Sequence, residues 1–296
     1  MKVYLENFLS ELDFPLGARE ALILAFRKIS ASKIATPRFF ELVEEYKNNP
    51  DFDFKEATKE AGELSERAGV VHFTGKLLFY ILMSQTLRER YRQRGIDDSV
   101  FKNSMLDLKY KVIECYEAYG IWGSFVAWWF SGFFKMNIFG LGRLQFELRT
   151  LGTDYEKDGI KLTPDSPVLS VHIPSAKEPF TYDKVWEAYK LAADFFRETL
   201  GDAPIVFYCN TWLFFEKHKE MLKPTSNIYR FMSDYDIFEY GLYDDYTQVW
   251  RLFGKYYTGN PDDMPADSSL RRSYIELMRR GEKTGWGTGV LVYKEK

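Results

Sequence analysis

The sequence contains few cysteines, few histidines and no excess of charge of one sign, and each shortage argues against a class of function. The two cysteines are Cys115 and Cys209. We expect the first on a helix and the second on a strand of another domain, so no disulfide is predicted. The 40 basic and 43 acidic residues nearly balance, which gives no reason to expect a nucleic acid or an anionic membrane surface as partner. No histidines and cysteines stand at metal-ligand spacing and no Gly-x-x-x-x-Gly-Lys-Ser/Thr loop occurs, so we predict no metal site and no such phosphate loop.

The sequence also lacks a segment apolar enough for export or for a membrane span. The first residues, Met1–Glu6, do not form the apolar core of a signal peptide, so we expect the protein in the cytoplasm, where thiols stay reduced. The uncharged stretch 121–134 (IWGSFVAWWFSGFF) falls short of the roughly 18–20 apolar residues that a spanning helix needs. We predict that this stretch forms a buried helix between two domains.

Apolar residues make up 46% of the chain and aromatic residues 18%, which is enough to build a packed core in each of two domains. Helical spacing of apolar residues marks six segments in the first part of the chain: 3–12, 18–29, one that begins at Thr36-Pro37, 54–68, 70–94 and 97–119. This pattern predicts an all-α domain over residues 1–135. The basic end of the longest segment, 87–94, is typical either of a phosphate-binding site or of a solvated helix end that complements the helix dipole.

A different pattern begins at Leu141, where apolar and polar residues alternate as far as Arg149. Side chains of a strand point alternately to opposite faces, so this alternation predicts a half-buried strand. Its polar face carries Arg143, Gln145, Glu147 and Arg149 in one row. Such a row is typical either of a solvated outer face or of a face that lines a cleft.

The rest of the chain, 136–296, shows strands and helices in the order β-β-β-α-β-α-β-α-β. Asp158-Gly159 predicts a hairpin turn between two short strands. A helix over 185–200 connects strands over 167–174 and 204–212, and a crossover of this kind makes the two strands parallel. We therefore predict a mixed α/β domain after the helical one.

Six short stretches of the sequence carry a family resemblance: LGRLQFE (141–147), VHIP (171–174), FYCNTWL (207–213), SNI (226–228), PADSSL (265–270) and GWGTG (285–289). With them the chain resembles, over nearly its whole length, a bacterial family of two-domain acyltransferase-domain proteins. Those proteins have a helical N-acyltransferase N-terminal domain and a C-terminal domain with an N-acetyltransferase-like (GNAT-like) fold. The resemblance implies an α+β protein with an all-α domain over 1–135 and a GNAT-like domain over 136–296. It further implies transfer of an acyl group from a small-molecule donor, acyl-CoA, to an amine acceptor, with no tightly bound cofactor.

One segment departs from the family pattern. GNAT enzymes carry a Gln/Arg-x-x-Gly-x-Gly/Ala loop between the strand and the crossover helix, and the backbone N–H groups of that loop hold the CoA pyrophosphate. The corresponding segment here, Pro174–Thr181 (PSAKEPFT), has no glycine. The N-terminus of the following helix still offers backbone N–H groups. Ser175, Lys177 and Thr181 are the candidate side chains for binding the cofactor.

Acyl transfer to an amine needs a base for the amine proton, donors for the oxyanion and an acid for the leaving thiolate. His172, one of three histidines, lies near the end of a predicted strand, and histidine is the commonest general base. Glu147 is the alternative base, or the group that orients His172. The same two residues are also typical of a hydrogen-bonded strand histidine and of a salt bridge from Glu147 to Arg143 or Arg149. We place Arg143 and Gln145 among the candidate substrate-binding residues.

Tyr208, Cys209 and Asn210 lie together at the far end of the second predicted parallel strand. Tyr208 is a candidate proton donor to the thiolate, and Asn210 and Asn227 are candidate substrate-binding residues. Cys209 suggests a rival chemistry, an acyl-cysteine intermediate activated by His172, although a strand cysteine is also typical of a buried core. The alternatives to an acyl-CoA-dependent transferase are therefore Cys209-dependent acyl transfer or hydrolysis and a non-catalytic module that binds a small ligand.

Overall fold

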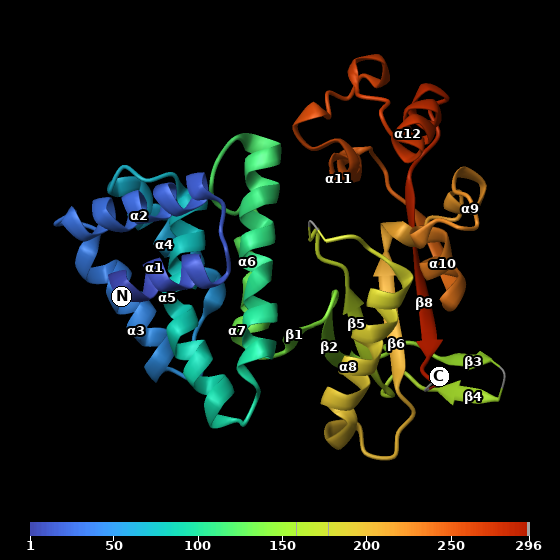
Figure 1. The fold of residues 1–296 in the computed structure, drawn as a ribbon, viewed down its shortest axis with the longest axis horizontal. Helices are drawn as coiled ribbons and strands as arrows, with labels where there is room; N and C mark the ends of the chain where they lie inside the picture. The colour runs from blue at the N-terminus through green and yellow to red at the C-terminus, as the bar shows by residue number, and fades with distance from the viewer. Residues whose placement is uncertain (158, 177, 295–296) are drawn as a thin grey trace. The chain divides into compact units, whose positions relative to one another are not determined.

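The computed structural model describes residues 1–157, 159–176 and 178–294. The chain divides into two compact units, Met1–Gly140 and Leu141–Lys296. The first unit is helical, and the second combines strands and helices (Figure 1). The predicted fold class, an all-α part followed by a mixed α/β part, is confirmed. Among the described residues, no helix combines the length and the apolar character that crossing a membrane requires.

The helical unit is organised around one buried helix. Its main helices are α1 (Lys2–Glu11), α2 (Leu16–Ala31), α3 (Thr36–Asn48), α4 (Phe54–Arg67), α5 (His72–Gln93) and α6 (Asp98–Tyr119). Helix α5 packs against each of the other five. Every residue from Leu77 to Ser84 is buried, so this part of α5 is enclosed on all sides, as a helix in the middle of a core must be.

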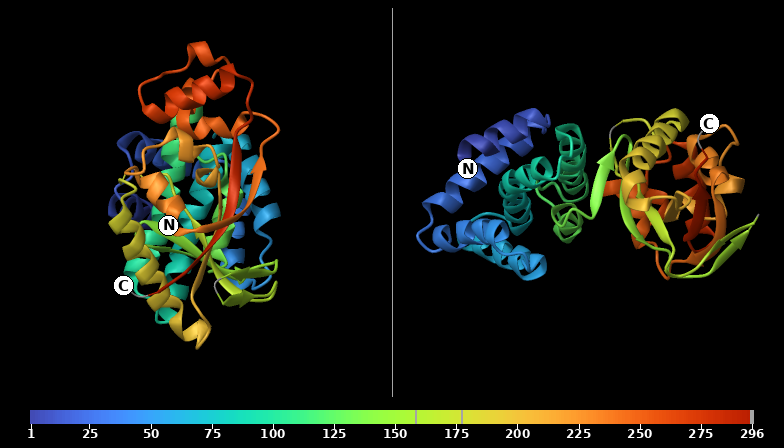
Figure 2. Two further views of the ribbon diagram at one scale, coloured as in Figure 1. Left: turned by 90° about the vertical axis from the view of Figure 1, so that its right-hand side faces the viewer. Right: turned by 90° about the horizontal axis from the view of Figure 1, so that it is seen from below.

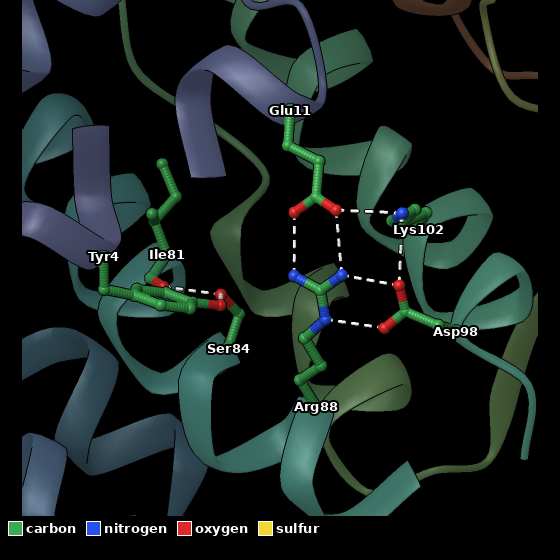
Figure 3. Close-up of polar contacts among 7 residues, drawn as sticks. All are labelled: Tyr4, Glu11, Ile81, Ser84, Arg88, Asp98 and Lys102. Carbon is green, nitrogen blue, oxygen red and sulfur yellow. Dashed lines mark hydrogen bonds and ion pairs between the residues drawn. The ribbon is translucent and has the colours of Figure 1, made fainter. Parts of the chain in front are cut away.

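The basic end of α5 is tied to two other helices by Arg88 (Figure 3). Arg88 Nη1 donates to Glu11 Oε2 of α1 at 2.7 Å, and Arg88 Nε donates to Asp98 Oδ1 of α6 at 2.6 Å. Lys102 Nζ lies 2.9 Å from Glu11 Oε1 and 3.2 Å from Asp98 Oδ2. The structure thus uses this arginine of the basic run for an ionic network within the protein.

The prediction of one helix over the aromatic stretch 121–134 is wrong. The stretch forms two short turns of helix, η1 (Ala127–Phe130) and α7 (Ser131–Phe134), after a non-helical segment. Gly123 explains the break, because a Cβ atom there would lie 2.5 Å from the carbonyl carbon of Phe73 in α5. Only a glycine allows the chain to pass so close to another backbone. The segment that takes this path is not helical, and the first helical turn begins at Ala127.

The α/β unit is built on a six-stranded sheet with the strand order β1-β2-β5-β6-β8-β7. Its strands are β1 (Ile138–Leu141), which contains the boundary between the units, β2 (Leu144–Thr150), β5 (Pro167–His172), β6 (Val206–Thr211), β7 (Asp236–Leu242) and β8 (Gly285–Val292). Strands β5 and β6 are parallel, whereas β2 pairs with β5, and β8 with both β6 and β7, in antiparallel fashion. The predicted parallel pair, joined through helix α8 (Tyr182–Leu200), is confirmed.

Two turns decide how the first strands of this unit pair. The predicted hairpin is confirmed as β3 (Tyr155–Lys157) and β4 (Ile160–Leu162), with Gly159 at a φ of 78°. The prediction of one strand from Leu141 to Arg149 is wrong, because Gly142, at a φ of 62°, and Arg143 form a turn between β1 and β2. The alternation from residue 144 onward does belong to one strand.

The two faces of the sheet are covered by different elements (Figure 2). Helix α8 packs on one face, where the ring of Tyr189 lies 4.5 Å from that of Phe207 and 6.4 Å from that of Phe146. The β3–β4 hairpin packs on the other face, in a cluster with Val168 and Val206. Because these two valines come early in β5 and β6, the hairpin covers one end of this face and leaves the carboxyl ends of the two parallel strands beyond it.

Short helices connect β6 to β7 and β7 to β8. They are η2 (Trp212–Phe214), α9 (His218–Met221), α10 (Asn227–Asp234), η3 (Thr247–Val249), α11 (Trp250–Phe253), η4 (Gly254–Tyr256), η5 (Pro261–Asp263) and α12 (Ser269–Arg279). His218 is fully buried there: Nδ1 donates to the carbonyl oxygen of Leu213 at 3.0 Å, so Nε2 accepts from the hydroxyl of Tyr274 at 2.8 Å. Burial lowers the pKa of His218, which keeps this histidine a neutral core residue.

Candidate active site

The parallel pairing of β5 with β6 ends before either strand does. The two strands share two register positions, the second of which is Ser170–Tyr208. Strand β5 nevertheless runs on to His172, and β6 runs on to Thr211. Where a ladder stops inside a sheet, the facing backbone edges offer N–H and C=O groups to another extended chain. This point in the sheet is therefore a natural place for a linear ligand.

The register places polar side chains on one face at this point. Ser170 lies opposite Tyr208. Residues two positions further along each strand return to the same face, so His172 and Asn210 share it. Asn210 in turn lies opposite Thr288 of β8. The carboxyl ends of β5 and β6 thus carry a histidine and an amide on the same face of the sheet, the face opposite α8.

His172 and Glu147 form the central pair of this face. His172 Nε2 lies 3.3 Å from Glu147 Oε2, and the two side chains are 26% and 31% exposed, so both are reachable from solvent. The hydrogen bond from His172 lowers the pKa of Glu147, and the group is therefore a carboxylate at neutral pH. A carboxylate accepts the proton of Nε2, which leaves Nδ1 as the proton-accepting nitrogen of the neutral imidazole. The pair has the form of a general base with an orienting carboxylate.

Asn210 and Tyr208 are held by contacts on the same face. Asn210 is exposed, and its Nδ2 donates to Thr288 Oγ1 at 2.7 Å, while Thr288 itself is buried. The amide oxygen of Asn210 is thereby oriented by a buried partner. The guanidinium of Arg149 lies 5.2 Å from the centre of the Tyr208 ring, which fixes the ring by a cation–π contact.

The two remaining residues of the predicted polar row have other surroundings. Gln145 lies opposite His172 in the register but is only 3% exposed. Arg143 lies in the turn before β2, where its Nη1 donates to the carbonyl oxygen of Pro174 at 3.0 Å and its guanidinium lies 5.4 Å from the centre of the Phe180 ring. Arg143 therefore anchors the segment that follows β5.

That segment leads directly into α8. Ser175 is exposed, and Lys177 lies outside the described residues. Thr181 occupies the N-cap position of α8, but its side chain makes no capping hydrogen bond. The first turn of a 19-residue helix is thus left without a side-chain cap from Thr181. Its backbone N–H groups attract anions, and the carboxylate of Asp183 in the same turn opposes this attraction.

The structure does not bring Cys209 and His172 together. Tyr208 shares a face with His172, so the next residue, Cys209, points to the opposite face. It is 1% exposed, and its thiol donates to the carbonyl oxygen of Val171 at 3.5 Å. Burial raises the pKa of this thiol far above its ordinary value, which disfavours the thiolate that a nucleophile needs. Asn227 is an exposed first residue of α10, next to the capping Ser226.

Sequence reasoning missed two members of this face, Ser170 and Thr288. Thr288 stands between Gly287 and Gly289, and a Cβ at either glycine would lie 2.9 Å from a neighbouring atom. The alternation of glycine with larger residues in β8 marks the face on which neighbouring atoms leave no room for a Cβ atom. The glycine alternation is visible in the sequence, but the sequence does not show which strand pairs with β8.

Within the part of the chain that the structure describes, no group of three or more His, Cys, Asp or Glu side chains is placed to hold a metal ion.

Comparisons with known proteins agree with this architecture. Residues 4–136 match the family described as N-acyltransferase N-terminal domain, and residues 138–291 match the GNAT-like C-terminal domain. No curated protein matches the sequence.

Solved structures share the fold over almost the whole chain. A crystal structure of an acyltransferase in complex with decanoyl-CoA and teicoplanin is 22% identical, covers 97% of this chain and 87% of its own, and superposes with a TM-score of 0.77. An acyltransferase in complex with CoA and 10C-teicoplanin is 20% identical over the same shares, with a TM-score of 0.75. Identities this low establish the common fold alone.

Proposed function

Because the chain belongs to the family that joins an N-acyltransferase N-terminal domain to a GNAT-like C-terminal domain, we propose that it transfers an acyl group from acyl-CoA to an amine. The observation that carries the proposal is the His172–Glu147 pair, which lies where the β5–β6 ladder ends. A base beside a break in a parallel pair places a proton acceptor next to a strand edge that can hold the donor.

In the proposed reaction, His172 Nδ1 takes a proton from the acceptor amine while the amine nitrogen attacks the thioester carbonyl. The new C–N bond forms, the C–S bond breaks, and the CoA thiolate leaves. Glu147 stabilises the imidazolium that this step creates. Tyr208, on the same face, is the proposed acid that returns a proton to the thiolate, and Asn210 and Gln145 are the proposed contacts to the acceptor.

The proposed donor site runs from the end of the ladder to the start of α8. The edges of β5 and β6 offer hydrogen bonds to an extended pantetheine arm, and the uncapped N-terminus of α8 attracts the pyrophosphate. Ser175 and Thr181 lie in the connecting segment, and Arg143 holds its backbone at Pro174. Acyl-CoA or CoA is also what the acyltransferases of this fold contain in their crystals.

The test pairs donor binding with turnover. The purified chain is melted with CoA, acetyl-CoA, octanoyl-CoA and decanoyl-CoA, and free thiol release is followed with a panel of amines. A donor at about a hundred times its Kd stabilises the native state by ~2.7 kcal/mol, which raises Tm by a few degrees. Replacement of a general base slows turnover by about 10²–10⁴-fold. We therefore expect His172→Ala to lose turnover and keep the donor-induced rise in Tm.

His72→Ala is the matched control, since His72 is a half-buried histidine of the helical unit that also pairs with a carboxylate, Glu66. Equal turnover in His172→Ala and His72→Ala would refute the assigned base. The segment without glycine favours a second candidate function, a non-catalytic module that binds a small ligand. If no CoA compound raises Tm, that candidate replaces the transferase.

A further inference from the structure

The helical unit contains a pocket of about 460 Å³, a size typical of small-molecule sites. Its lining comes from three places in the chain: the start of α4, one side of α5, and the segment that contains η1 and α7. Aromatic rings and lysines dominate it, among them Phe54, Lys76, Tyr80, Trp128 and Lys135. All of the lining residues belong to this unit, so the pocket does not depend on the proposed transferase site.

The charge on the pocket wall is strongly positive. Lys55, Lys59, Lys76 and Lys135 line it, against one carboxylate, Asp53. That carboxylate is engaged elsewhere, because Asp53 Oδ1 accepts the backbone N–H of Lys55 at 3.0 Å and caps α4. Among the described residues, Lys55, Lys76 and Lys135 form no ion pair with a carboxylate. Lys59 does have an acidic partner, since its Nζ lies 3.8 Å from Glu56 Oε2. The other three ammonium groups give the wall a charge that attracts anions.

The rest of the pocket is suited to a flat apolar group. Tyr80 is buried, and its hydroxyl lies 2.9 Å from Thr58 Oγ1, so its ring is held in place. The ring of Phe54 has the ammonium of Lys135 5.5 Å from its centre. Trp128 stands at the rim with 69% of its surface exposed, although large apolar side chains are usually withdrawn from water. A ring that enters the pocket would cover this indole.

Lys76 is positioned by a glycine in the facing helix. A Cβ atom at Gly62 would lie 2.6 Å from Lys76 Cε, so the lysine stem lies directly on α4 at that residue. Glycine inside a helix costs about 1 kcal/mol relative to alanine, so its presence here has a stability cost. The space that it leaves directs the half-buried Lys76 along the pocket wall.

We propose that this pocket is a second ligand site, which binds a small molecule that combines an aromatic ring with a phosphate or carboxylate group. The lysines bind the anion and the aromatic wall binds the ring. Neither group alone explains the pocket, because a neutral ring leaves the ammonium groups without a partner and a bare anion leaves Trp128 exposed.

The probe is 1-naphthyl phosphate, with 1-naphthoate and neutral 1-naphthol as comparisons, titrated into the full chain by calorimetry. We expect saturable binding of both anions, weaker at high salt, and at least tenfold weaker binding of 1-naphthol, because a hydrogen bond to a charged group accounts for about a tenfold change or more. Lys76→Met should raise the Kd of 1-naphthyl phosphate about tenfold. Lys33→Met, an exposed lysine of the same unit outside the pocket, should leave it unchanged.

Gly62→Ala separates binding from folding. Alanine is the better helix former, so Tm should stay the same or rise, while its Cβ displaces Lys76 and weakens binding of the probe. The proposal is overturned if no probe binds saturably, if 1-naphthol binds as tightly as the phosphate, or if Lys76→Met and Lys33→Met give the same Kd. Displacement of the probe by decanoyl-CoA, with no effect of Lys76→Met, would place the probe at the transferase site and also overturn it.

Discussion

On one face of the sheet in the α/β unit, Phe146, Phe207 and Cys209 lie beneath α8 and its neighbours. On the other face, the same strands carry Glu147 and His172 beyond the end of the β3–β4 hairpin. The residues of the first face are nearly inaccessible, whereas those of the second keep about a quarter to a third of their side-chain surface in water.

This contrast follows from the alternation of side chains along a strand, since neighbours in sequence belong to opposite environments. Tyr208 and Cys209 show it most directly, with a ring on the polar face and a thiol in the core. The comparison teaches that stability and chemistry are carried by different residues of the same strands. Substitutions on the packed face should therefore change the free energy of unfolding, and substitutions on the polar face should change turnover.

The largest effect should come from Phe207→Ala on the packed face. Phe207 is fully buried, and its ring stacks on that of Tyr189 with a centroid distance of 4.5 Å. Removing a buried phenylalanine costs about 3–5 kcal/mol through lost transfer energy and the cavity left behind. We expect urea unfolding, followed by circular dichroism, to show a loss of that size in the α/β unit.

Phe238→Ala on the edge strand β7 is the matched control, because that ring is 37% exposed. The free energy of unfolding lost in Phe238→Ala should be less than half of that lost in Phe207→Ala. Equal destabilisation by the two variants would contradict the assignment of the packed face as the source of stability.

A smaller effect, in turnover, should come from Glu147→Gln on the polar face. A hydrogen bond to a charged group contributes about 1.5–3 kcal/mol, and partial exposure of this pair argues for the low end, so turnover should fall about tenfold. The residual hydrogen bond of the amide keeps His172 in place, and Tm at neutral pH should fall slightly, because the stabilising charge of the carboxylate is lost.

The lowered pKa of Glu147 also predicts how the stability of the protein changes with pH. The pKa of Glu147 lies below its ordinary value in the folded protein, so the unfolded chain binds a proton more readily. The pairing therefore stabilises the fold above pH about 4.5, and this contribution disappears as the pH falls through the lower folded value. The wild type should lose more Tm than Glu147→Gln between pH 5 and pH 3. If Tm falls equally in the two proteins between pH 5 and pH 3, the hydrogen bond from His172 does not stabilise the carboxylate of Glu147.

Much of this arrangement is predictable from the sequence. The helices of the first unit, the β3–β4 hairpin and the crossover between β5 and β6 follow from local periodicity and turn residues. The pairing of His172 with Glu147 is also within reach, since both stand on polar faces of their strands. Local patterns suffice in these cases because each element is defined by its own residues.

The failures have one physical cause, which is that local sequence patterns do not record how one segment of the chain meets another. The alternation from Leu141 runs through the turn at Gly142 and Arg143 without a break, so the turn is hidden. Which face of β6 meets His172 depends on the geometry of the α8 crossover, and this left a Cys209–His172 pair open as a hypothesis. The helical path of 121–126 is excluded by a backbone contact to Phe73, which no local pattern records.

We expect the smallest effect from Cys209→Ala. This variant tests the difference between the two faces at neighbouring residues of β6, since Cys209 directly follows Tyr208. The thiol is buried and makes one weak hydrogen bond to the carbonyl of Val171, so its removal should cost about 1 kcal/mol of stability. Turnover should not change, because the side chain lies on the face opposite His172. Cys115→Ala, a buried cysteine of the helical unit, is the control for cavity formation. Intact mass spectrometry of the wild type during turnover should show no acyl adduct. An acyl group trapped on Cys209, together with loss of turnover in Cys209→Ala, would mean that the packed face carries chemistry and that the two faces are not divided as the strand alternation requires.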